Sequence, residues 1–313
     1  MIKKFLDTLP TIWAMSEIEI HKFVAIISSL QIDMSKFAEI EAAMEARHSD
    51  VDFFIQRLSK SFAKVNVVGP IMQHESFWTF FGLATSSVTL KKVFNELAAD
   101  DRIEDVLIEF DTPGGGIPGL VDAADALAHL SKHKNTIAQV SGMTASAGYW
   151  LASQTRTIFA GRGDDIGSIG VRMTVVDTSE FFAGRGIKVI AIDTGNFKSA
   201  GVEGLPISKE QLANFQETVD KVFKTFLEAI IEGRPGLTMQ DLITTPDRQG
   251  LADGRMFLAP DALKHGLIDG IATIDSTIAT VLGDNAPNPM ELSEADNEII
   301  AKRQEKFLKR LEQ

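Results

Sequence analysis

Apolar residues in the middle of the chain, from about residue 63 onwards, follow two different spacings. Short runs rich in β-branched residues predict buried strands at 65–71, 105–110, 135–140, 157–160, 171–176 and 187–192. Stretches with apolar residues three or four positions apart predict helices at 88–99, 119–130, 147–154, 179–183 and 208–232. Because the predicted strands and helices alternate, we expect an α/β fold with a largely parallel sheet and right-handed crossovers.

The longest predicted helix, 208–232, carries an apolar stripe that we expect to be buried along its whole length. The stripe consists of Leu212, Phe215, Val219, Val222, Phe223, Phe226, Leu227 and Ile230. A later segment, 254–271, predicts a strand, a helix and a glycine-closed end.

Both ends of the chain differ from this middle part. Residues 1–60 have apolar residues at helical spacing and predict a helical N-terminal arm in which no chemistry is visible. The main domain then covers residues 61–283. Within 284–313, a polar segment with prolines predicts a linker, and the charged residues after it predict a C-terminal helix. We expect the arm and the terminal helix to be packing or assembly surfaces.

Composition narrows the possible functions. The formal net charge of −12 argues against a general binder of nucleic acid or anionic membranes. The chain has no cysteine, which excludes disulfides, thiolate metal sites and a cysteine nucleophile. The apolar run 23–30 is too short to span a bilayer, and Asp7 and Pro10 interrupt a signal-like start. We therefore expect a soluble, cytoplasmic protein with no nucleic-acid or membrane partner.

A serine lies at the junction between the predicted strand 135–140 and the predicted helix 147–154. In the segment SGMTASAGYW, Ser146 stands where a strand-to-helix turn would expose its hydroxyl at the carboxyl edge of the sheet. A nucleophile elbow exposes its serine at the same kind of turn, although the sequence Thr-Ala-Ser-Ala-Gly differs from the Gly-x-Ser-x-Gly pattern. Close packing of small residues before a helix is the alternative explanation.

A serine nucleophile needs a neighbouring base, and the six histidines are poorly placed for that role. Because His74 follows a strand end, a Ser–His–Asp triad is not excluded. Lysine is the known substitute, and Lys198 follows the predicted strand 187–192 within the segment NFKSAG. A free lysine titrates near pH 10.4, so an apolar setting would have to lower that value by roughly 2–3 units. An ordinary surface lysine is the alternative.

The third candidate element is the glycine-rich segment DTPGGG, residues 111–116. Consecutive glycines after a buried strand let the backbone approach a ligand and direct N–H groups at an anion. A phosphate loop is the rival explanation, but the segment lacks the Gly-Lys-Ser/Thr ending, and Pro113 removes one donor. An oxyanion hole fits better, with the N–H groups of Gly115 and Ala147 as its donors.

Five motifs occur in the order DTPGGG, SGMTASAGYWLAS, IGSIGVRM, FKSAG and GRMFLAPDALKHGLIDGI. Together they resemble the signal peptide peptidase A / protease IV family of serine peptidases over about residues 63–282. The resemblance is strongest to the phage head-assembly proteases of the lambda protein C type. It implies a ClpP/crotonase-type fold with repeated β-β-α units, and a reaction that needs no metal or cofactor.

Carried over by motif, the resemblance implies that Ser146 is the nucleophile and Lys198 the general base. Ser168, in IGSIG, would bind and orient the lysine amine, and Gly115 and Ala147 would stabilise the oxyanion. In one departure from the family pattern, its usual Ser-Gly-Gly is Ser-Ala-Gly here.

The resulting expectation is a serine endopeptidase with a Ser–Lys dyad. By resemblance, its substrates would be scaffold or capsid proteins during phage or prophage head assembly, in the host cytoplasm or the prohead, and it would form a homo-oligomer. One alternative is a cytoplasmic degradative protease like signal peptide peptidase A. Others are an acyl-thioester enzyme of the crotonase kind and a scaffold-binding structural protein with a vestigial dyad.

Overall fold

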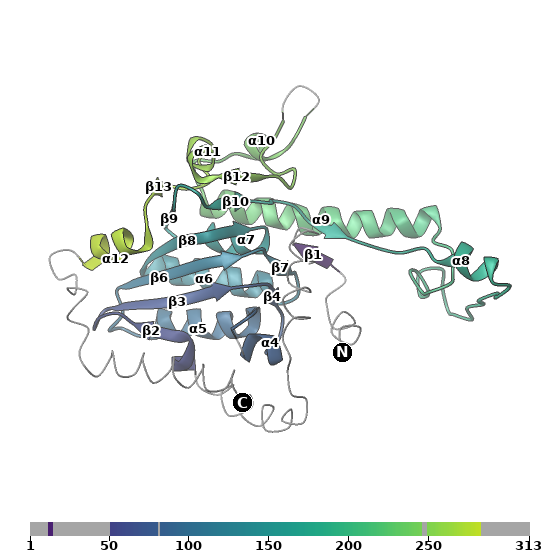
Figure 1. Ribbon diagram of the computed structural model, residues 1–313, viewed down its shortest axis with the longest axis horizontal. Helices are drawn as coiled ribbons and strands as arrows, with labels where there is room; N and C mark the ends of the chain where they lie inside the picture. The colour runs from purple at the N-terminus through teal and green to yellow at the C-terminus, as the bar shows by residue number, and fades with distance from the viewer. Residues whose placement is uncertain (1–11, 15–50, 81, 246–248, 283–313) are drawn as a thin grey trace. The chain divides into compact units, whose positions relative to one another are not determined.

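The computed structural model of the chain describes residues 12–14, 51–80, 82–245 and 249–282 (Figure 1). The chain divides into two units, Met1–Ala272 and Thr273–Gln313. The first unit contains the sheets and all the predicted site residues. In the second unit, the described part is a helix, α12 (Ile274–Leu282).

The larger sheet in the described residues has the strand order β12-β10-β8-β6-β3-β2, and β9 pairs with β8 and β13 beside this path. Strands β3, β6, β8, β9 and β10 form its parallel part, whereas β2 and β12 are antiparallel to their neighbours. The bounds are β2 Ile55–Arg57, β3 Phe62–Val68, β6 Asp105–Thr112, β8 Asn135–Ala145, β9 Thr157–Ala160, β10 Asp165–Gly167, β12 Met256–Leu258 and β13 Gly270–Ile271.

A smaller sheet has the order β11-β1-β7-β4-β5. Its strands are β1 Ile12–Ala14, β4 Ile71–Met72, β5 Thr85–Ser86, β7 Gly115–Gly116 and β11 Arg172–Met173. Strands β3 and β6 of the larger sheet are each followed by a short strand of the smaller sheet, β4 and β7. A long helix comes next, directly after β7 and, after β4, beyond the short elements α4 (Phe77–Phe80) and β5. The α/β class is thus confirmed, and these β-β-α units are those expected of a ClpP/crotonase-type fold.

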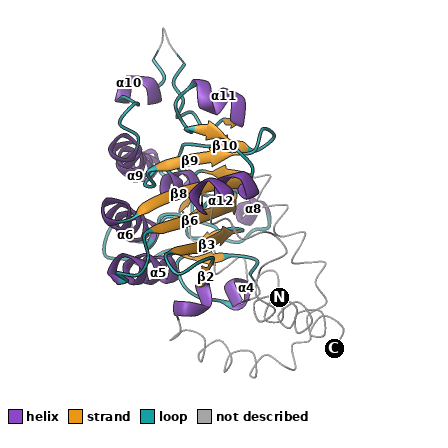
Figure 2. Ribbon diagram, turned by 90° about the vertical axis from the view of Figure 1, so that its left-hand side faces the viewer, coloured by secondary structure: helices purple, strands orange, loops and turns teal. Residues whose placement is uncertain are grey.

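Three long helices, α5 (Ser87–Ala99), α6 (Leu120–His133) and α9 (Lys209–Gly233), lie along one face of the larger sheet (Figure 2). In α5, the buried residues Leu90, Val93, Phe94 and Leu97 follow the helical spacing that predicted it. The shorter helical segments are Val51–Phe54, α4 Phe77–Phe80, α7 Ala147–Ala152, α8 Ser179–Gly184, α10 Met239–Leu242 and α11 Ala259–Lys264.

The C-terminal half of α9 holds the short helix α7 in place. The rings of Trp150 and Phe226 stack with their centroids 4.6 Å apart and an interplanar angle of 8°. Nearby, Tyr149 donates a hydrogen bond to the carbonyl of Leu267 (2.8 Å). Because Tyr149 and Trp150 lie in α7, three and four residues after Ser146, this packing fixes the helix that begins directly after the predicted nucleophile.

Two predictions about the segment after β10 are wrong. The run 187–192 forms no strand, and Ile190 and Ile192 are 70% and 98% exposed. The strand expected at 171–176 is reduced to the two residues of β11. A β-branched run becomes a strand only where a neighbouring strand accepts its hydrogen bonds, and among the described residues no strand pairs with 187–192.

The apolar stripe of α9 is buried only in part. Phe226, Leu227 and Ile230 are buried, whereas Leu212 is 47% exposed. The N-terminal half of the helix therefore extends beyond the packed core, and α8 lies at that end, away from the sheets (Figure 1). The expectation of a fully buried stripe is corrected because helical periodicity predicts which face is apolar but not what covers it.

Most of the predicted N-terminal arm and the linker and helix within 284–313 lie outside the described residues, so these predictions stay untested. The described parts of residues 1–60 are 12–14 and 51–60, which contain β1, the 3-10 helix Val51–Phe54 and β2. At β1 and β2 the expectation of a helix is wrong, because both segments pair with neighbouring strands. Among the described residues, no helix is long and apolar enough to cross a bilayer.

Candidate active site

Ser146 occupies a strained turn between β8 and α7. Its φ and ψ are 52° and −114°, a conformation that a residue with a side chain rarely adopts. Among the described residues, Ser146 and Ser168 are the non-glycine residues with positive φ. Each such residue costs about 1–3 kcal/mol, and strain of this kind concentrates at functional sites. The backbone thus marks independently the two serines that the motifs selected.

Ser168 lies directly beside Ser146. Strand β10 runs parallel to β8 with Gly167 opposite Ala145, and the N–H of Ser146 donates to the carbonyl of Gly167 (2.7 Å). The N–H of Ser168 donates to the carbonyl of Arg255 (2.7 Å), the residue directly before β12. Since neighbouring strands are about 4.8 Å apart, the two serines occupy adjacent positions where β8 and β10 end.

Gly115 is enclosed by the backbone of β4. An added Cβ at Gly115 would lie 2.0 Å from the carbonyl oxygen of Ile71, so no larger residue fits. The N–H of Ile71 donates to the carbonyl of Gly114 (2.8 Å), the parallel-ladder bond that accompanies the Ile71–Gly115 pair. In such a ladder the N–H of Gly115 points away from β4 and towards the opposite edge of β7. The glycine predicted as an oxyanion donor thus presents its N–H on the side away from β4.

Thr112 joins the glycine loop to α7. Its hydroxyl donates to the carbonyl of Gly69 (2.7 Å) and accepts from the N–H of Gly114 (3.1 Å). An added Cβ at Gly148 would lie 2.4 Å from the Thr112 methyl carbon. Thr112 therefore sets both the conformation of the loop and the distance between the loop and the start of α7.

Ala147 is the first residue of α7 and is fully buried. Its N–H belongs to the first turn, whose amides have no acceptor within the helix. Helix α7 packs against β6 and β7, the strands that carry Thr112 and Gly115. The structure thus brings Ser146, Ala147, Gly115 and Ser168 to one edge, where β8, β10 and β7 end.

Lys198 is not part of this group. It is exposed, between Asn196 and Ser199 on a segment that we call the lysine arm, residues 174–206 between β11 and α9. The side-chain amide of Gln211 donates to the carbonyl of Asn196, which holds this part of the arm to the start of α9. Gln211 and Phe226 are separated by about 22 Å along the helix axis. Because Phe226 packs on α7, Lys198 lies far beyond the reach of Ser146 in the same chain.

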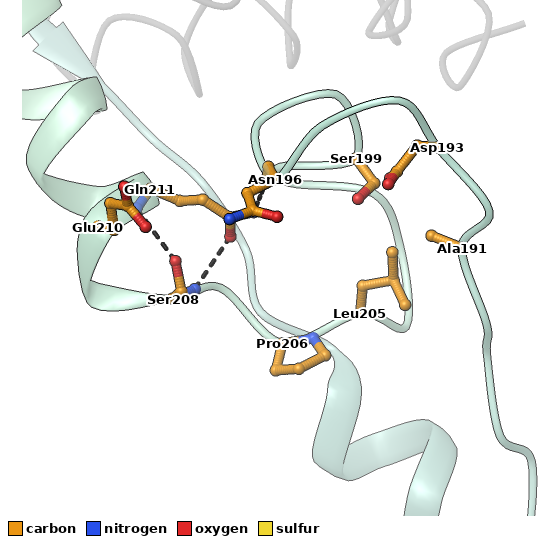
Figure 3. A pocket seen from close by; sticks show the side chains of 9 residues that line it. All are labelled: Ala191, Asp193, Asn196, Ser199, Leu205, Pro206, Ser208, Glu210 and Gln211. Atoms are coloured by element: carbon orange, nitrogen blue, oxygen red, sulfur yellow. Dashed lines mark hydrogen bonds between the residues drawn. The ribbon is translucent and has the colours of Figure 1, made fainter.

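The lysine arm is ordered mainly by its own contacts. Asp177 accepts hydrogen bonds from Ser179 at the beginning of α8 and from the N–H of Ile207, the residue directly after the arm (3.1 Å). The hydrogen bonds from Ser179, with that from Ile207, hold the pKa of Asp177 below its usual value. A hollow of about 360 Å³, lined by the nine residues labelled in Figure 3, lies beside the start of α9. These hydrogen bonds give the arm a defined shape, and none of them involves Ser146.

The histidine alternative finds no support in the surroundings of Ser146. The hydroxyl of Ser146 donates to the carbonyl of Gly170 (3.4 Å), and the side chain is 1% exposed. His74 is exposed in the segment between β4 and α4. Within the described ranges, no group of three or more histidine, aspartate or glutamate residues could hold a metal ion.

The sequence did not single out Thr112 or the ion pair beneath α7. Arg234 donates to both oxygens of Asp269 (2.8 and 2.6 Å), close to Tyr149. Complete burial raises the pKa of Tyr149 well above its ordinary value, with the charge of Arg234 opposing and that of Asp269 adding to the shift. Thr112, Tyr149 and Asp269 lie inside the motifs and Arg234 lies outside them, but the motifs do not show which side chains meet. Only the fold relates these contacts to Ser146.

Comparison with known proteins identifies the family. Peptidase family S49 matches residues 128–284, half of the chain, and the chain therefore belongs to this family. The matched range includes Ser146, Ser168 and Lys198, and the membership confirms the resemblance found from the motifs.

Relatives include a protein of Methanocaldococcus jannaschii described as a protease, 27% identical over 59% of this chain and 58% of its own length. Protease 4 of Haemophilus influenzae is 28% identical over 69% of this chain and 33% of its own length. Capsid assembly protease C of Escherichia phage lambda is 25% identical over 60% and 41%. The chain thus spans a third to somewhat more than half of the length of these relatives.

Among solved structures, an enoyl-CoA hydratase/isomerase family member aligns over 82% of this chain and 85% of its own, with 14% identity and a TM-score of 0.38. A similarity of this size adds nothing to the fold assignment, which rests on the strands and helices themselves.

Proposed function

We propose that the protein is a serine endopeptidase in which Ser146 of one subunit works with Lys198 of a neighbouring copy. The observation that carries the proposal is the strained backbone of Ser146 next to Ser168 and to two candidate oxyanion donors. Membership of peptidase family S49 supports the class of reaction.

In this mechanism the hydroxyl of Ser146 attacks the scissile carbonyl while the neutral amine of Lys198 takes its proton. The N–H groups of Gly115 and Ala147 stabilise the negative oxygen of the tetrahedral intermediate. The protonated lysine then gives its proton to the leaving amine, and a water activated by the same lysine hydrolyses the acyl-enzyme. Ser168 accepts a hydrogen bond from the lysine and orients it towards Ser146.

In the proposed assembly, Lys198 would come close to Ser146 and the exposed apolar side chains of the lysine arm would be covered. Lys198 is exposed and far from Ser146, and it would become desolvated when the lysine arm of one copy docks beside Ser146 of another. Desolvation favours the neutral amine, which is the form a general base requires. The arm is also rich in exposed apolar side chains, namely Val176, Phe181, Ile187, Ile190, Ile192, Phe197 and Val202. Exposed apolar side chains gathered on one segment favour a protein interface there.

The proposed substrates are extended polypeptides, taken up by strand addition to the small sheet beside β7. Because one relative is named as the capsid assembly protease of phage lambda, we propose scaffold or capsid proteins as the natural substrates. The enzyme would then act in the host cytoplasm or in the prohead.

The test compares wild type with Ser146→Ala and Lys198→Ala on an unfolded protein such as casein. Both variants should lose about 10³-fold or more in kcat/KM. Lys188→Ala, which removes another exposed lysine from the same arm, serves as the matched control and should keep full activity. Labelling by a fluorophosphonate should be abolished in Ser146→Ala, strongly slowed in Lys198→Ala and unchanged in Lys188→Ala. Undiminished cleavage by either dyad variant contradicts the proposal.

A further inference from the structure

The N-terminal strand β1 lies between two strands that are distant from it in the sequence. It pairs antiparallel with β7, with Trp13 opposite Gly116 and Ala14 opposite Gly115. On its other edge it pairs antiparallel with β11, with Ile12 opposite Met173. Figure 1 shows β1 in this position beside β7. A segment from the start of the chain therefore adds a strand to the small sheet.

The two neighbours of β1 are the strands that flank Ser146. Gly170, whose carbonyl accepts the hydrogen bond of the Ser146 hydroxyl, precedes β11 by two residues. Strand β7 carries Gly115, and α7, which begins directly after Ser146, packs against it. Because the other edge of β7 is taken by β4, a peptide that adds to β7 must use the position of β1.

The register of β1 places one particular residue at the proposed oxyanion donor. The N–H of Gly115 points away from β4, which is the side on which β1 lies. Ala14 is the residue opposite Gly115. In an antiparallel pair of this type, the residue opposite an inward-facing N–H presents its carbonyl to that group. The carbonyl that β1 offers to the oxyanion position is therefore that of Ala14.

We propose that Ile12–Ala14 is a substrate strand supplied by the chain itself, and that the peptide bond following Ala14 is a self-cleavage site. The inference rests on the proposed peptidase function and adds the identity of one substrate. Until it is cut or displaced, β1 occupies the binding position and keeps other polypeptides out, so cleavage would also release the site.

The reaction is an ordinary acyl transfer. The Ser146 oxygen bonds to the Ala14 carbonyl carbon, and its proton passes through the base to the amine of residue 15 as the carbon–nitrogen bond breaks. Water then cleaves the ester and restores the serine. The products are a fragment of residues 1–14 that ends in a carboxylate and a shortened chain with a free amine at residue 15.

The test follows the intact mass of the purified full chain over time, alongside its activity on casein. Wild type should lose residues 1–14, and Ser146→Ala should keep them. Ala14→Ser, which stays small, should still be cut, whereas Ala14→Glu places a charge at the scissile position and should stay whole. A synthetic peptide of residues 8–19 should be cut by wild type at the same bond, and this measurement does not depend on how the variants fold.

The outcomes separate the inference from the function on which it rests. A wild type that digests casein but keeps residues 1–14, and leaves the synthetic peptide whole, overturns the self-cleavage site and leaves the peptidase standing. Cleavage at a different bond overturns the register, and loss of residues 1–14 from Ser146→Ala assigns the cut to another enzyme. A wild type that digests neither casein nor the peptide overturns both proposals.

Discussion

The methyl group of Thr112 fills the space that a side chain on Gly148 would need. The distance from an added Cβ at Gly148 to the Thr112 methyl carbon would be 2.4 Å, whereas the other nearby atoms of Thr112 would be at 3.6 Å or more. The threonine cannot simply rotate away, because its hydroxyl is held by Gly69 and Gly114. The glycine loop and the nucleophile helix are therefore in contact through one methyl group.

Gly148→Ala should destabilise the protein by about 1–3 kcal/mol, the usual cost of overpacking a rigid core. It should also lower kcat, because the clash pushes α7 away from the glycine loop. Thr112→Ser removes the methyl group and keeps the hydroxyl, so adding it to Gly148→Ala should restore much of both losses. Urea unfolding and casein hydrolysis measure the two effects. A double variant no better than Gly148→Ala would show that this contact does not set the spacing.

Tyr149 should stay protonated at alkaline pH until the protein unfolds. Burial raises its pKa well above the ordinary value, so the unfolded chain loses the phenolic proton before the folded chain does. Above about pH 10 the native state therefore binds more protons, and stability falls as the pH rises. Tyr149 is the sole tyrosine in the sequence, so tyrosinate absorbance reports on it alone. Absorbance that develops in the folded protein near pH 10 would contradict this account.

The Arg234–Asp269 pair should contribute more to stability than the ion pairs on the surface. The Arg234 side chain is 8% exposed and donates two hydrogen bonds to the carboxylate, so Arg234→Met should cost about 2–3 kcal/mol. Lys264→Met removes a lysine from a solvent-exposed pair with Asp261 and should leave the denaturation midpoint unchanged. Equal denaturation midpoints for the two variants would argue against a structural role of the buried pair.

Ile192→Asp should break the assembly without unfolding the subunit. The side chain is 98% exposed in the single chain, so a charge there has no folded contact to disturb. In the proposed assembly the same charge would be buried against a second copy at a large cost. Light scattering should show smaller particles, casein hydrolysis should fall, and circular dichroism should not change. Leu263→Asp, on α11 outside the lysine arm, is the matched control and should keep both the assembly and the activity.

The sequence predicted those parts of the fold in which local pattern and tertiary burial agree. Strand β6 and helix α5 appear close to their expected bounds. Most positions of β6 are buried, and α5 buries its apolar face in the core. Ser146 could be selected because it stands among small residues at a strand-to-helix junction, and Ser168 could be selected through the family resemblance of the segment IGSIG. The pairing of Gly115 with Ile71 could not be foreseen, since it depends on two segments separated by a whole helix.

The errors fall where the single chain leaves apolar residues uncovered. The apolar pattern predicted a strand at 187–192, because a β-branched run gives the same signal whether its partner strand lies in the same molecule or in another. Strand β1 was missed for the opposite reason. Three residues within a longer apolar stretch give no periodic signal, and their conformation is set by β7 and β11.

The claim that Ser146 and Lys198 act from different subunits can be tested by mixing two inactive proteins. Ser146→Ala and Lys198→Ala are combined under conditions that allow subunits to exchange, and mass spectrometry follows the formation of mixed oligomers. Random exchange places an intact serine next to an intact lysine at about one site in four, so activity should return to about a quarter of the wild-type value. If mixed oligomers form and activity stays at the level of the separate variants, the two residues do not form a site between subunits.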